Sequence, residues 1–453
     1  MSQKQISPAR RAAFDILRRV ETEGAYASVL AARLAQSSLS REDRALAQEL
    51  VLGALRRQLE LDYFIERYSA RPVNRLDPPV LVALRIGLYQ LRHLTRIPPS
   101  AAVNESVNLV KQSRAKSAAG MTNAALRNAA RNLDERLEDL LSESHGDTLA
   151  RASIELSHPA WMLDRWAAQL GRDEMRLVAL ANNNAAPLAF RLNTLRASAP
   201  ATLAQLEQEG VHARPSTLIP GAFVLESGSA SALVHAAETG LVYIQDEASQ
   251  MVSLLLDPKP GERVLDLCAA PGSKSSHIAA LTGDACSVIA CDLHAHRLST
   301  LAATCRRLDV TNVEAVAVDA TTGLPFVRGQ EFDRVLIDAP CSGTGTLRRN
   351  PEIKWRLAPD HLPDLVDVQS SLLARAASVV REGGRLVYST CSIEREENEG
   401  VIERFLEGGR FRLVEPAVEP TIEPGLITES GYVRTFPHRH QTDGFFAAVL
   451  EKV

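Results

Sequence analysis

Two cysteines, each directly after a strand-like run, are the residues of this chain best suited to covalent chemistry. Cys341 follows the run Val335–Pro340 (VLIDAP), and Cys391 follows the run Arg385–Thr390 (RLVYST). In an open α/β sheet, ligands bind just beyond the carboxyl ends of the strands. Two thiols delivered to that edge predict covalent attack on a bound substrate, because a thiolate is a strong nucleophile.

A tight turn after an earlier strand predicts a cofactor site. The run Val264–Leu267 is followed by Cys268, Ala269, Ala270, Pro271, Gly272, Ser273 and Lys274, and a helix begins near Ser275. A dinucleotide would need the G-x-G-x-x-G pattern, of which only one glycine is present. A cofactor without a pyrophosphate fits better, and S-adenosylmethionine is such a cofactor. The small side chains would let it approach the backbone.

Carboxylates follow four of the predicted strands, at Asp266, Asp292, Asp319 and Asp338. Asp292 is placed to accept hydrogen bonds from ribose hydroxyls, as the acidic residue does in dinucleotide folds. Asp319 is placed to accept from an adenine amino group. A single aspartate after a strand is usually only a helix cap, so the series is the specific signal.

The sequence around Cys341 favours a pyrimidine substrate. Amino-group methyltransferases usually carry an Asn/Asp-Pro-Pro-aromatic box here, whereas this chain has Asp338-Ala339-Pro340-Cys341. A thiolate that adds to C6 of cytosine makes C5 nucleophilic enough to take a methyl group, and Asp338 could bind or protonate N3. Without a family resemblance, the residues favour Cys341 as the attacking thiol, because the Pro-Cys thiol is the one that DNA enzymes use.

The elements that position these residues alternate between strand and helix from about residue 261. This βαβ series predicts a parallel doubly wound, Rossmann-like sheet, with Phe445–Leu450 as an antiparallel strand at its edge. The predicted strands are Val264–Leu267, Val288–Cys291, Val313–Val318, Val335–Ile337 and Arg385–Tyr388, and the predicted helices are Ser275–Leu281, Ala295–Leu308 and Leu365–Val380.

The first part of the chain predicts a different fold class. Residues 1–140 have helical periodicity, with Ser40 and Asp43 as a capping pair, a shared face for Val51, Leu55 and Leu59, and a helix opened by Pro78. The acidic stretch Leu137–Leu149 predicts a linker. We therefore expect a multidomain protein: an all-α bundle (1–140), a small α+β domain (150–240) and an α/β catalytic domain (241–453).

Charge is distributed unevenly along the chain. Residues 1–133 hold 21 Lys and Arg against 11 Asp and Glu, which gives +10, and the remainder holds 30 against 44, which gives −14. The basic end predicts contact with nucleic acid, and the alternative is a solvated arginine-rich surface. The cysteines do not form a disulfide framework, and neither a secretory leader nor a membrane span is predicted. These features predict a cytoplasmic protein.

Several motifs together resemble the RNA cytosine-C5 methyltransferases, and within them the bacterial small-subunit rRNA enzymes of the Sun/Fmu type. They are Gln245–Ser249, Cys268–Lys274, Asp338–Gly345, Arg349–Glu352, and Ser389–Ser392 followed by Glu396–Glu399. Residues 1–140 resemble the NusB-type RNA-binding domain of this branch, and residues 150–240 an RRM-like domain.

The resemblance implies a role for each candidate residue. Cys391 is the nucleophile, Cys341 assists product release, and Asp338 with Lys274 acts beside the base. Unassembled 16S rRNA is the implied partner. The implied S-adenosylmethionine site is formed by Cys268, Ala269, Ala270, Pro271, Gly272, Ser273, Lys274, Asp292, Asp319 and Asp338.

Some expectations stay open at this stage. The family usually has glycine where Ser273 stands, and we expect the serine side chain to point outward. The spacing of Cys286, Cys291, His294 and His296 is not a zinc pattern, so no metal is predicted. We expect a monomer. The alternatives are a non-catalytic RNA-binding assembly or antitermination factor and a DNA cytosine methyltransferase.

Overall fold

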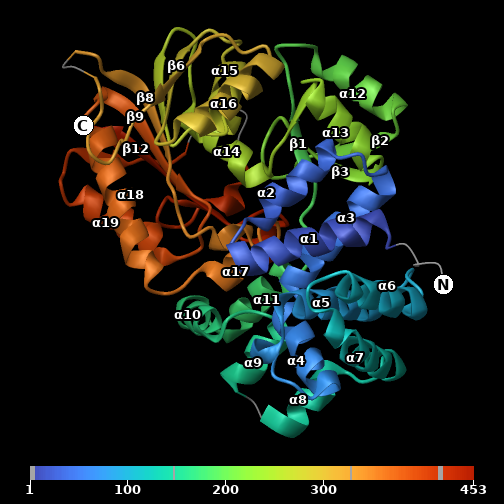
Figure 1. The fold of residues 1–453 in the computed structure, drawn as a ribbon. Helices are drawn as coiled ribbons and strands as arrows, with labels where there is room; N and C mark the ends of the chain where they lie inside the picture. The colour runs from blue at the N-terminus through green and yellow to red at the C-terminus, as the bar shows by residue number, and fades with distance from the viewer. Residues whose placement is uncertain (1–5, 146–147, 327–328, 417–421) are drawn as a thin grey trace. The chain divides into compact units, whose positions relative to one another are not determined.

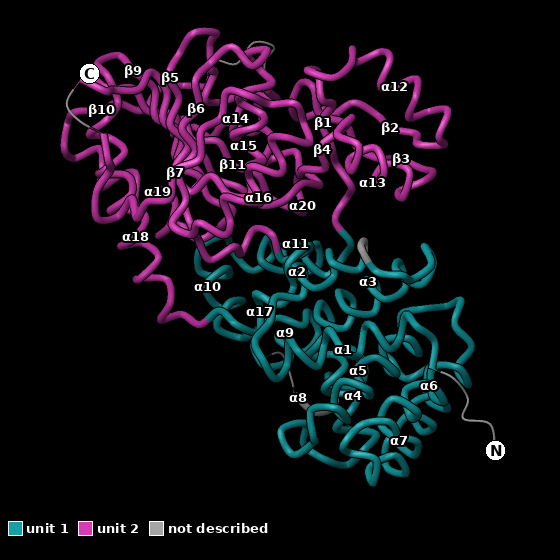
Figure 2. Tube along the Cα trace, turned by 45° about the horizontal axis from the view of Figure 1, so that its top comes forward, with its two compact units in different colours: residues 1–185, 347–357 teal, residues 186–346, 358–453 magenta. Residues whose placement is uncertain are grey.

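The chain leaves one structural unit and later re-enters it (Figure 2). The computed structural model describes residues 6–145, 148–326, 329–416 and 422–453. Residues 1–185 and 347–357 form the first unit, here called the helical unit. Residues 186–346 and 358–453 form the second, here called the sheet unit.

The helical unit is built from short amphipathic helices, and those over residues 8–131 share one apolar core, as the sequence predicts for residues 1–140. Ser40 caps α3 by accepting from the amide of Asp43, and Pro78 opens α5. Its helices are α1 (Pro8–Glu23), α2 (Ala27–Ala32), α3 (Arg41–Arg56), α4 (Gln58–Ser69), α5 (Pro78–His93), α6 (Pro99–Lys111), α7 (Ala119–Arg131), α8 (Leu137–His145), α9 (Leu149–Leu156), α10 (Ala160–Leu170), α11 (Arg172–Asn182) and α17 (Ile353–Arg356).

Two local expectations are wrong in this unit. Leu59 does not continue the face of Val51 and Leu55, because the helix is interrupted at Arg57 and Leu59 belongs to α4. The stretch predicted as a linker is helical over Leu137–His145, because its leucines recur at helical spacing and Leu141 is fully buried.

The segment Leu347–Leu357 belongs to the helical unit although it directly follows the loop of Cys341 in sequence. Lys354 is fully buried, and its ammonium donates to Arg56 O and Ser157 O, both at 2.8 Å, and to Asn183 Oδ1 at 3.1 Å. Burial and the nearby guanidinium groups lower the pKa of Lys354 well below its ordinary value. Trp355 packs against the helical core and donates to Leu55 O, so it serves packing.

A small antiparallel sheet opens the sheet unit. Its elements run β-α-β-β-α-β and its strand order is β2-β3-β1-β4, which is the ferredoxin-like arrangement. The sequence predicts strands at Leu188–Asn193, Ala222–Leu225 and Val242–Ile244 and a helix at Ala201–Glu209, and it misses β2 and α13. The elements are β1 (Ala189–Leu192), α12 (Ala199–Gln208), β2 (Val211–Pro215), β3 (Ala222–Gly228), α13 (Ala230–Glu238) and β4 (Val242–Ile244).

The large sheet contains the predicted parallel strands (Figure 1). Its order is β10-β12-β9-β8-β5-β6-β7, with β11 paired to β12, and β5, β6, β7, β8 and β9 are parallel. The last strand is antiparallel as predicted but does not lie at the edge, because β10 pairs with its outer side. The elements are α14 (Glu247–Leu256), β5 (Arg263–Leu267), α15 (Ser273–Leu281), β6 (Ser287–Asp292), α16 (Ala295–Arg307), β7 (Val313–Ala317), β8 (Phe332–Asp338), α18 (His361–Ala377), β9 (Val380–Thr390), α19 (Glu399–Leu406), β10 (Phe411–Leu413), β11 (Val433–Thr435), α20 (Pro437–His440) and β12 (Phe445–Lys452).

Alternating residues of the central strands bury against helices on opposite faces of this sheet. Leu386 and Tyr388 lie in one apolar cluster with α18 and α19, whereas Val387 lies in another with α14. Both faces are therefore covered, as a parallel sheet requires. The strand order reverses between β5 and β8, and the crevice at their carboxyl ends is where such a fold binds ligands.

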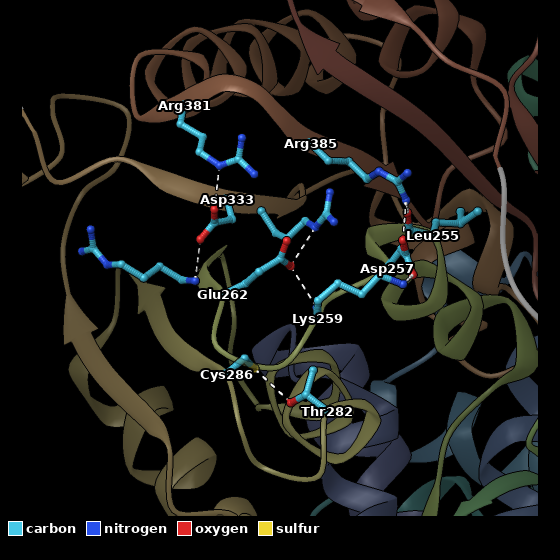
Figure 3. A network of polar contacts seen from close by, with 11 residues as sticks. Leu255, Asp257, Lys259, Glu262, Thr282, Cys286, Asp333, Arg381 and Arg385 are labelled. Carbon is cyan, nitrogen blue, oxygen red and sulfur yellow. Dashed lines mark hydrogen bonds and ion pairs between the residues drawn. The ribbon is translucent and has the colours of Figure 1, made fainter.

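The opposite, amino-terminal edge of the sheet is held by charged side chains (Figure 3). Asp333 accepts from the amide of Arg263 and from Arg381 Nε, and Glu262 accepts from Arg334 Nε at 3.0 Å. These contacts join the starts of β5, β8 and β9. They lie at the edge of the sheet opposite to the crevice where ligands are expected. Among the residues that the structure describes, no helix is long and apolar enough to cross a membrane.

The buried ammonium of Lys354 yields a stability prediction. Lys354→Met keeps an unbranched side chain but removes the ammonium donor from the oxygens of Arg56, Ser157 and Asn183, so we expect a loss of about 3 kcal/mol or more in unfolding free energy. Urea titration followed by tryptophan fluorescence measures it, because Trp161, Trp166 and Trp355 all belong to the helical unit. The exposed Lys116→Met is the matched control, and equal midpoints for both variants would contradict the anchoring role.

Candidate active site

The turn after β5 brings a glycine and a helix N-terminus to the crevice. The amide of Ala269 donates to Cys291 O at 2.8 Å, and that of Ala270 donates to Asp292 Oδ2 at 3.3 Å. Gly272 has φ +95°, a backbone conformation that favours glycine, and caps α15. Ala269 and Ala270 are small and buried, Cys268 and Ser273 are partly buried, and Pro271 is exposed.

Asp266 lies fully buried in β5, just before this turn. Its Oδ2 accepts from Ser275 Oγ at 2.6 Å, whereas its Oδ1 has no hydrogen-bond partner within the described ranges. Burial raises the pKa of Asp266 to about 7. The unpartnered Oδ1 is the atom to which a cationic ligand would donate a hydrogen bond.

Lys274 connects the cofactor turn to the strand that leads to Cys341. Its ammonium lies 2.6 Å from Asp338 Oδ2 and 3.1 Å from Ser249 Oγ, and Lys274 is only 6% exposed. Burial lowers the pKa of Lys274, but the Asp338 charge and hydrogen bond, together with Asp266, outweigh it and raise this pKa overall. The remaining oxygen of Asp338 accepts from Ser389 Oγ at 2.9 Å. Lys274 and Asp338 therefore form a charged pair, which Ser249 holds at the ammonium and Ser389 holds at the carboxylate.

The two cysteines predicted to share a site lie side by side. Their sulfur atoms are 3.2 Å apart, although 50 residues separate them in sequence. Both side chains are partly exposed. The hydrogen bond to Cys391, followed by burial and nearby negative charge, raises the pKa of Cys341 well above its ordinary value. Cys341 therefore keeps its proton.

The two outer carboxylates differ in their surroundings. Asp292 is 4% exposed, and it accepts from the amides of Ala270 and His294 and pairs with Arg297. It lies against the cofactor turn, as expected. Asp319 is exposed, and its contacts are local, with Thr321 and Thr322. The hydrogen bonds from Thr321 lower the pKa of Asp319.

Arg191 of the small sheet supports the turn after β5, and nothing in the sequence indicates this role. Arg191 of β1 is 3% exposed, and its guanidinium donates to Ser276 Oγ at 3.0 Å and to Ser273 O at 3.4 Å. Burial lowers the pKa of Arg191 to about 10. A basic residue in a short strand carries no pattern that would single it out.

Other residues near the site could have been found from motifs already noted. Ser249 lies in the Gln245–Ser249 motif, and Ser389 directly precedes Thr390-Cys391. Glu397 lies in the acidic Glu396–Glu399 stretch and is fully buried beneath both cysteine loops. In each case the residue belongs to a motif or lies beside one, but the sequence does not indicate which side chain it contacts.

The residues at this edge fit S-adenosylmethionine. Small side chains at Ala269, Ala270 and Gly272 leave the backbone approachable. The unpartnered Oδ1 of Asp266 matches a cationic group, and the buried carboxylate of Asp292 stands where ribose hydroxyls are expected. The turn offers only one glycine, so it does not match a pyrophosphate site.

Three family models match successive parts of the chain. Residues 7–131 match the NusB family, residues 158–231 match the ferredoxin-like domain of RsmF/B-like methyltransferases, and residues 253–451 match 16S rRNA methyltransferase RsmB/F. These matches confirm the predicted NusB-like bundle, small α+β domain and methyltransferase domain.

Curated relatives match over nearly the whole chain. The "Probable ribosomal RNA small subunit methyltransferase B" of Bacillus subtilis (strain 168) is 34% identical, over 98% of this chain and 98% of its own length. The protein of the same description from Synechocystis sp. is 36% identical, over 98% of this chain and 99% of its own length. "Ribosomal RNA small subunit methyltransferase B" of Escherichia coli O1:K1 / APEC is 34% identical over 92% of each chain.

Solved structures agree with this assignment. The crystal structure of PH0851 has a TM-score of 0.79 and 29% identity, and the match covers 99% of this chain and 100% of that one. A methyltransferase homolog from Pyrococcus horikoshii has a TM-score of 0.57 and 30% identity, over 68% of this chain and 99% of its own. Such relatives favour an RNA enzyme over the DNA enzyme and the non-catalytic factor. The chain belongs to the RsmB/F family of 16S rRNA methyltransferases, and its cofactor is S-adenosylmethionine.

Proposed function

We propose that this protein methylates C5 of one cytosine in unassembled 16S rRNA, with Cys391 as the nucleophile and Cys341 as the residue that assists release. The observation that carries the proposal is the thiol pair, 3.2 Å apart and beside the Lys274–Asp338 pair. Two thiols at one strand edge suit a reaction in which a covalent bond to the substrate must be both made and broken.

Attack by Cys391 is supported by the raised pKa of its neighbour, Cys341. The first cause of that raised pKa is the hydrogen bond between the two thiols, so Cys341 keeps its proton and Cys391 is left as the nucleophile. Lys274 also lies close enough to Cys391 for the two side chains to interact electrostatically. The Cys391 thiolate adds to C6 of cytosine, and the electron pair moves to C5.

Asp338 and Lys274 are placed to act on the base while this bond forms. The Lys274–Asp338 pair holds one proton that can be transferred, and its transfer through Asp338 to N3 draws electrons from C6 and assists addition. S-adenosylmethionine, when bound, supplies an electrophilic methyl group for C5. Cys268–Lys274, Asp292, Asp319 and Asp338 would hold it, and Pro271 and Asp319 are the exposed members of this set.

Release follows from the coupling of the two thiols. Once the Cys391 sulfur is bonded to carbon it carries neither a proton nor a charge, so its contribution to the raised pKa of Cys341 becomes smaller. The Cys341 thiol then gives its proton to solvent more readily, and the thiolate so formed takes the C5 proton. The electron pair of that C–H bond restores the C5–C6 double bond, and the bond between Cys391 and C6 breaks.

Replacing the nucleophile tests the first step. Cys391→Ala should lower methyl transfer on the order of 10⁴-fold or more, because the covalent step is lost. Incorporation of labelled methyl groups into 16S rRNA transcripts measures this. Cys305→Ala, which removes a buried thiol of α16, should stay active. Turnover by Cys391→Ala would rule out its role as the nucleophile.

Replacing the second thiol tests release. Cys341→Ala should form the bond to cytosine but fail to resolve it, so a protein–RNA adduct should accumulate as a slow band on denaturing gels. The double variant Cys341→Ala, Cys391→Ala should give no such band. If the band were absent from Cys341→Ala while methyl transfer continued, Cys341 would have no part in release.

The target is tested in cells. Bisulfite sequencing of rRNA with and without this protein should show one cytosine in 16S rRNA that loses protection when the protein is absent. Expression of the wild-type protein, but not of Cys391→Ala, should restore protection. An identical pattern in all strains would refute cytosine-C5 methylation of rRNA.

A further inference from the structure

We propose that Glu397 is a positioning residue that sets the distance between the two thiols. This inference rests on the proposed function for its catalytic meaning, although the geometry stands by itself. Glu397 ends the short 3-10 helix Arg395–Glu397, is fully buried and touches neither sulfur directly. Its carboxylate reaches both cysteine loops through the residues that follow them.

The contacts of Glu397 with the two loops are nearly symmetrical. Ser342 directly follows Cys341, and Ser392 directly follows Cys391. Each serine hydroxyl donates to the same atom, Oε2 of Glu397, at 2.5 Å. One oxygen atom therefore holds both loops at once, and the two serine hydroxyls lie 3.0 Å from each other.

The other oxygen fixes the loop of Cys341 further. Oε1 accepts from the amide of Ser342 at 2.8 Å and from Gln369 Nε2 at 2.9 Å. Gln369 belongs to α18 and also donates to Pro340 O at 3.0 Å. The carboxylate thus accepts four hydrogen bonds, which uses the acceptor capacity of an ionised carboxyl group.

A second layer prevents the segment of Glu397 from moving. Asn398 accepts from Thr390 Oγ1 at 2.5 Å and donates to Ser392 O at 2.9 Å, and Tyr388 donates to Glu397 O at 2.6 Å. Thr390 immediately precedes Cys391 in sequence. The segment is therefore bonded to the Cys391 strand on both sides of that thiol, which leaves Glu397 little freedom.

The physical consequence is a fixed separation of two groups that would otherwise lie on independent loops. An amide in place of the carboxylate offers one acceptor oxygen instead of two. It can therefore accept from the two serine hydroxyls, or from the Ser342 amide and Gln369, but not from both sets at once. The loops would then settle independently. Misplacement of reacting groups by about 1 Å can lower a rate on the order of 100-fold.

Disulfide formation provides a measure of the thiol separation that does not depend on methylation. Diamide oxidises two close thiols: its N=N bond takes up both hydrogens and becomes a hydrazine, and the two sulfurs join. The rate of Cys341–Cys391 disulfide formation is followed by peptide mass spectrometry. We expect it to fall about tenfold or more in Glu397→Gln, because the disulfide needs specific geometry.

Glu396→Gln is the matched control, because Glu396 is exposed and lies in the same 3-10 helix. It should form the disulfide at the wild-type rate. If Glu397→Gln does not fold, the single variants Ser342→Ala and Ser392→Ala replace it. Each removes one of the hydroxyl contacts to Glu397 and should also slow formation of the disulfide. An unchanged rate in Glu397→Gln, or in the folded serine variants, would overturn the positioning role.

Activity assays separate this proposal from the proposed function. Glu397→Gln should lower kcat for methylation roughly 100-fold with an unchanged KM for S-adenosylmethionine. If the wild-type protein methylates no cytosine, the proposed function fails, and the disulfide rates still decide the role of Glu397. If the disulfide rate falls while kcat does not, Glu397 sets the separation but catalysis does not require it, which overturns the catalytic part of the inference.

Discussion

The parallel pairing of β8 with β9 is the constraint on which the site depends. Its register places Asp338 opposite Ser389; Cys391 directly follows β9, and Cys341 lies three residues after β8. Because neighbouring side chains of a strand point to opposite faces, a slip by one residue would turn Asp338 away from Lys274 and separate the thiols. The charged contacts at the other edge of the sheet hold the starts of β5, β8 and β9 together. The register that is fixed at the amino-terminal edge therefore sets the positions of the site residues at the carboxyl edge.

Lys274 and Glu397 are buried charged groups near this pairing, and each has compensating contacts. The ammonium of Lys274 faces Asp338, and the carboxylate of Glu397 accepts four hydrogen bonds. A buried ion pair is a weak source of stability, but an unpaired buried ion is strongly unfavourable. The arrangement therefore gives precise placement of groups rather than a large gain in stability. Asp266, with one oxygen unpartnered and a pKa raised to about 7, is the exception, and it lies where a cofactor would supply the missing partner.

Strand ends and motif residues could be predicted from sequence because they depend on local pattern. The alternation of strand and helix led to β5, β6, β8 and β9, and with them to the edge where Asp266, Asp338, Cys341 and Cys391 stand. Contacts between distant segments could not be predicted in this way. Nothing in the acidic run around Glu397 indicates that two serines 50 residues apart share its carboxylate. Helix α8 was missed because its acidic residues hide the leucine spacing, and Trp355 gave no sign that it belongs to the helical unit.

The insertion of Leu347–Leu357 into the helical unit also has a consequence for synthesis of the chain. The ribosome makes residues 1–185 first, but the eleven residues that complete their packing follow only after the 161 residues of 186–346. At usual rates of translation this delay is roughly ten to thirty seconds. During that time the acceptors of Lys354, at Arg56, Ser157 and Asn183, lack their ammonium donor. Final closure of the helical unit is therefore tied to emergence of the Cys341 loop, and a chain that stops before residue 347 leaves both units incomplete.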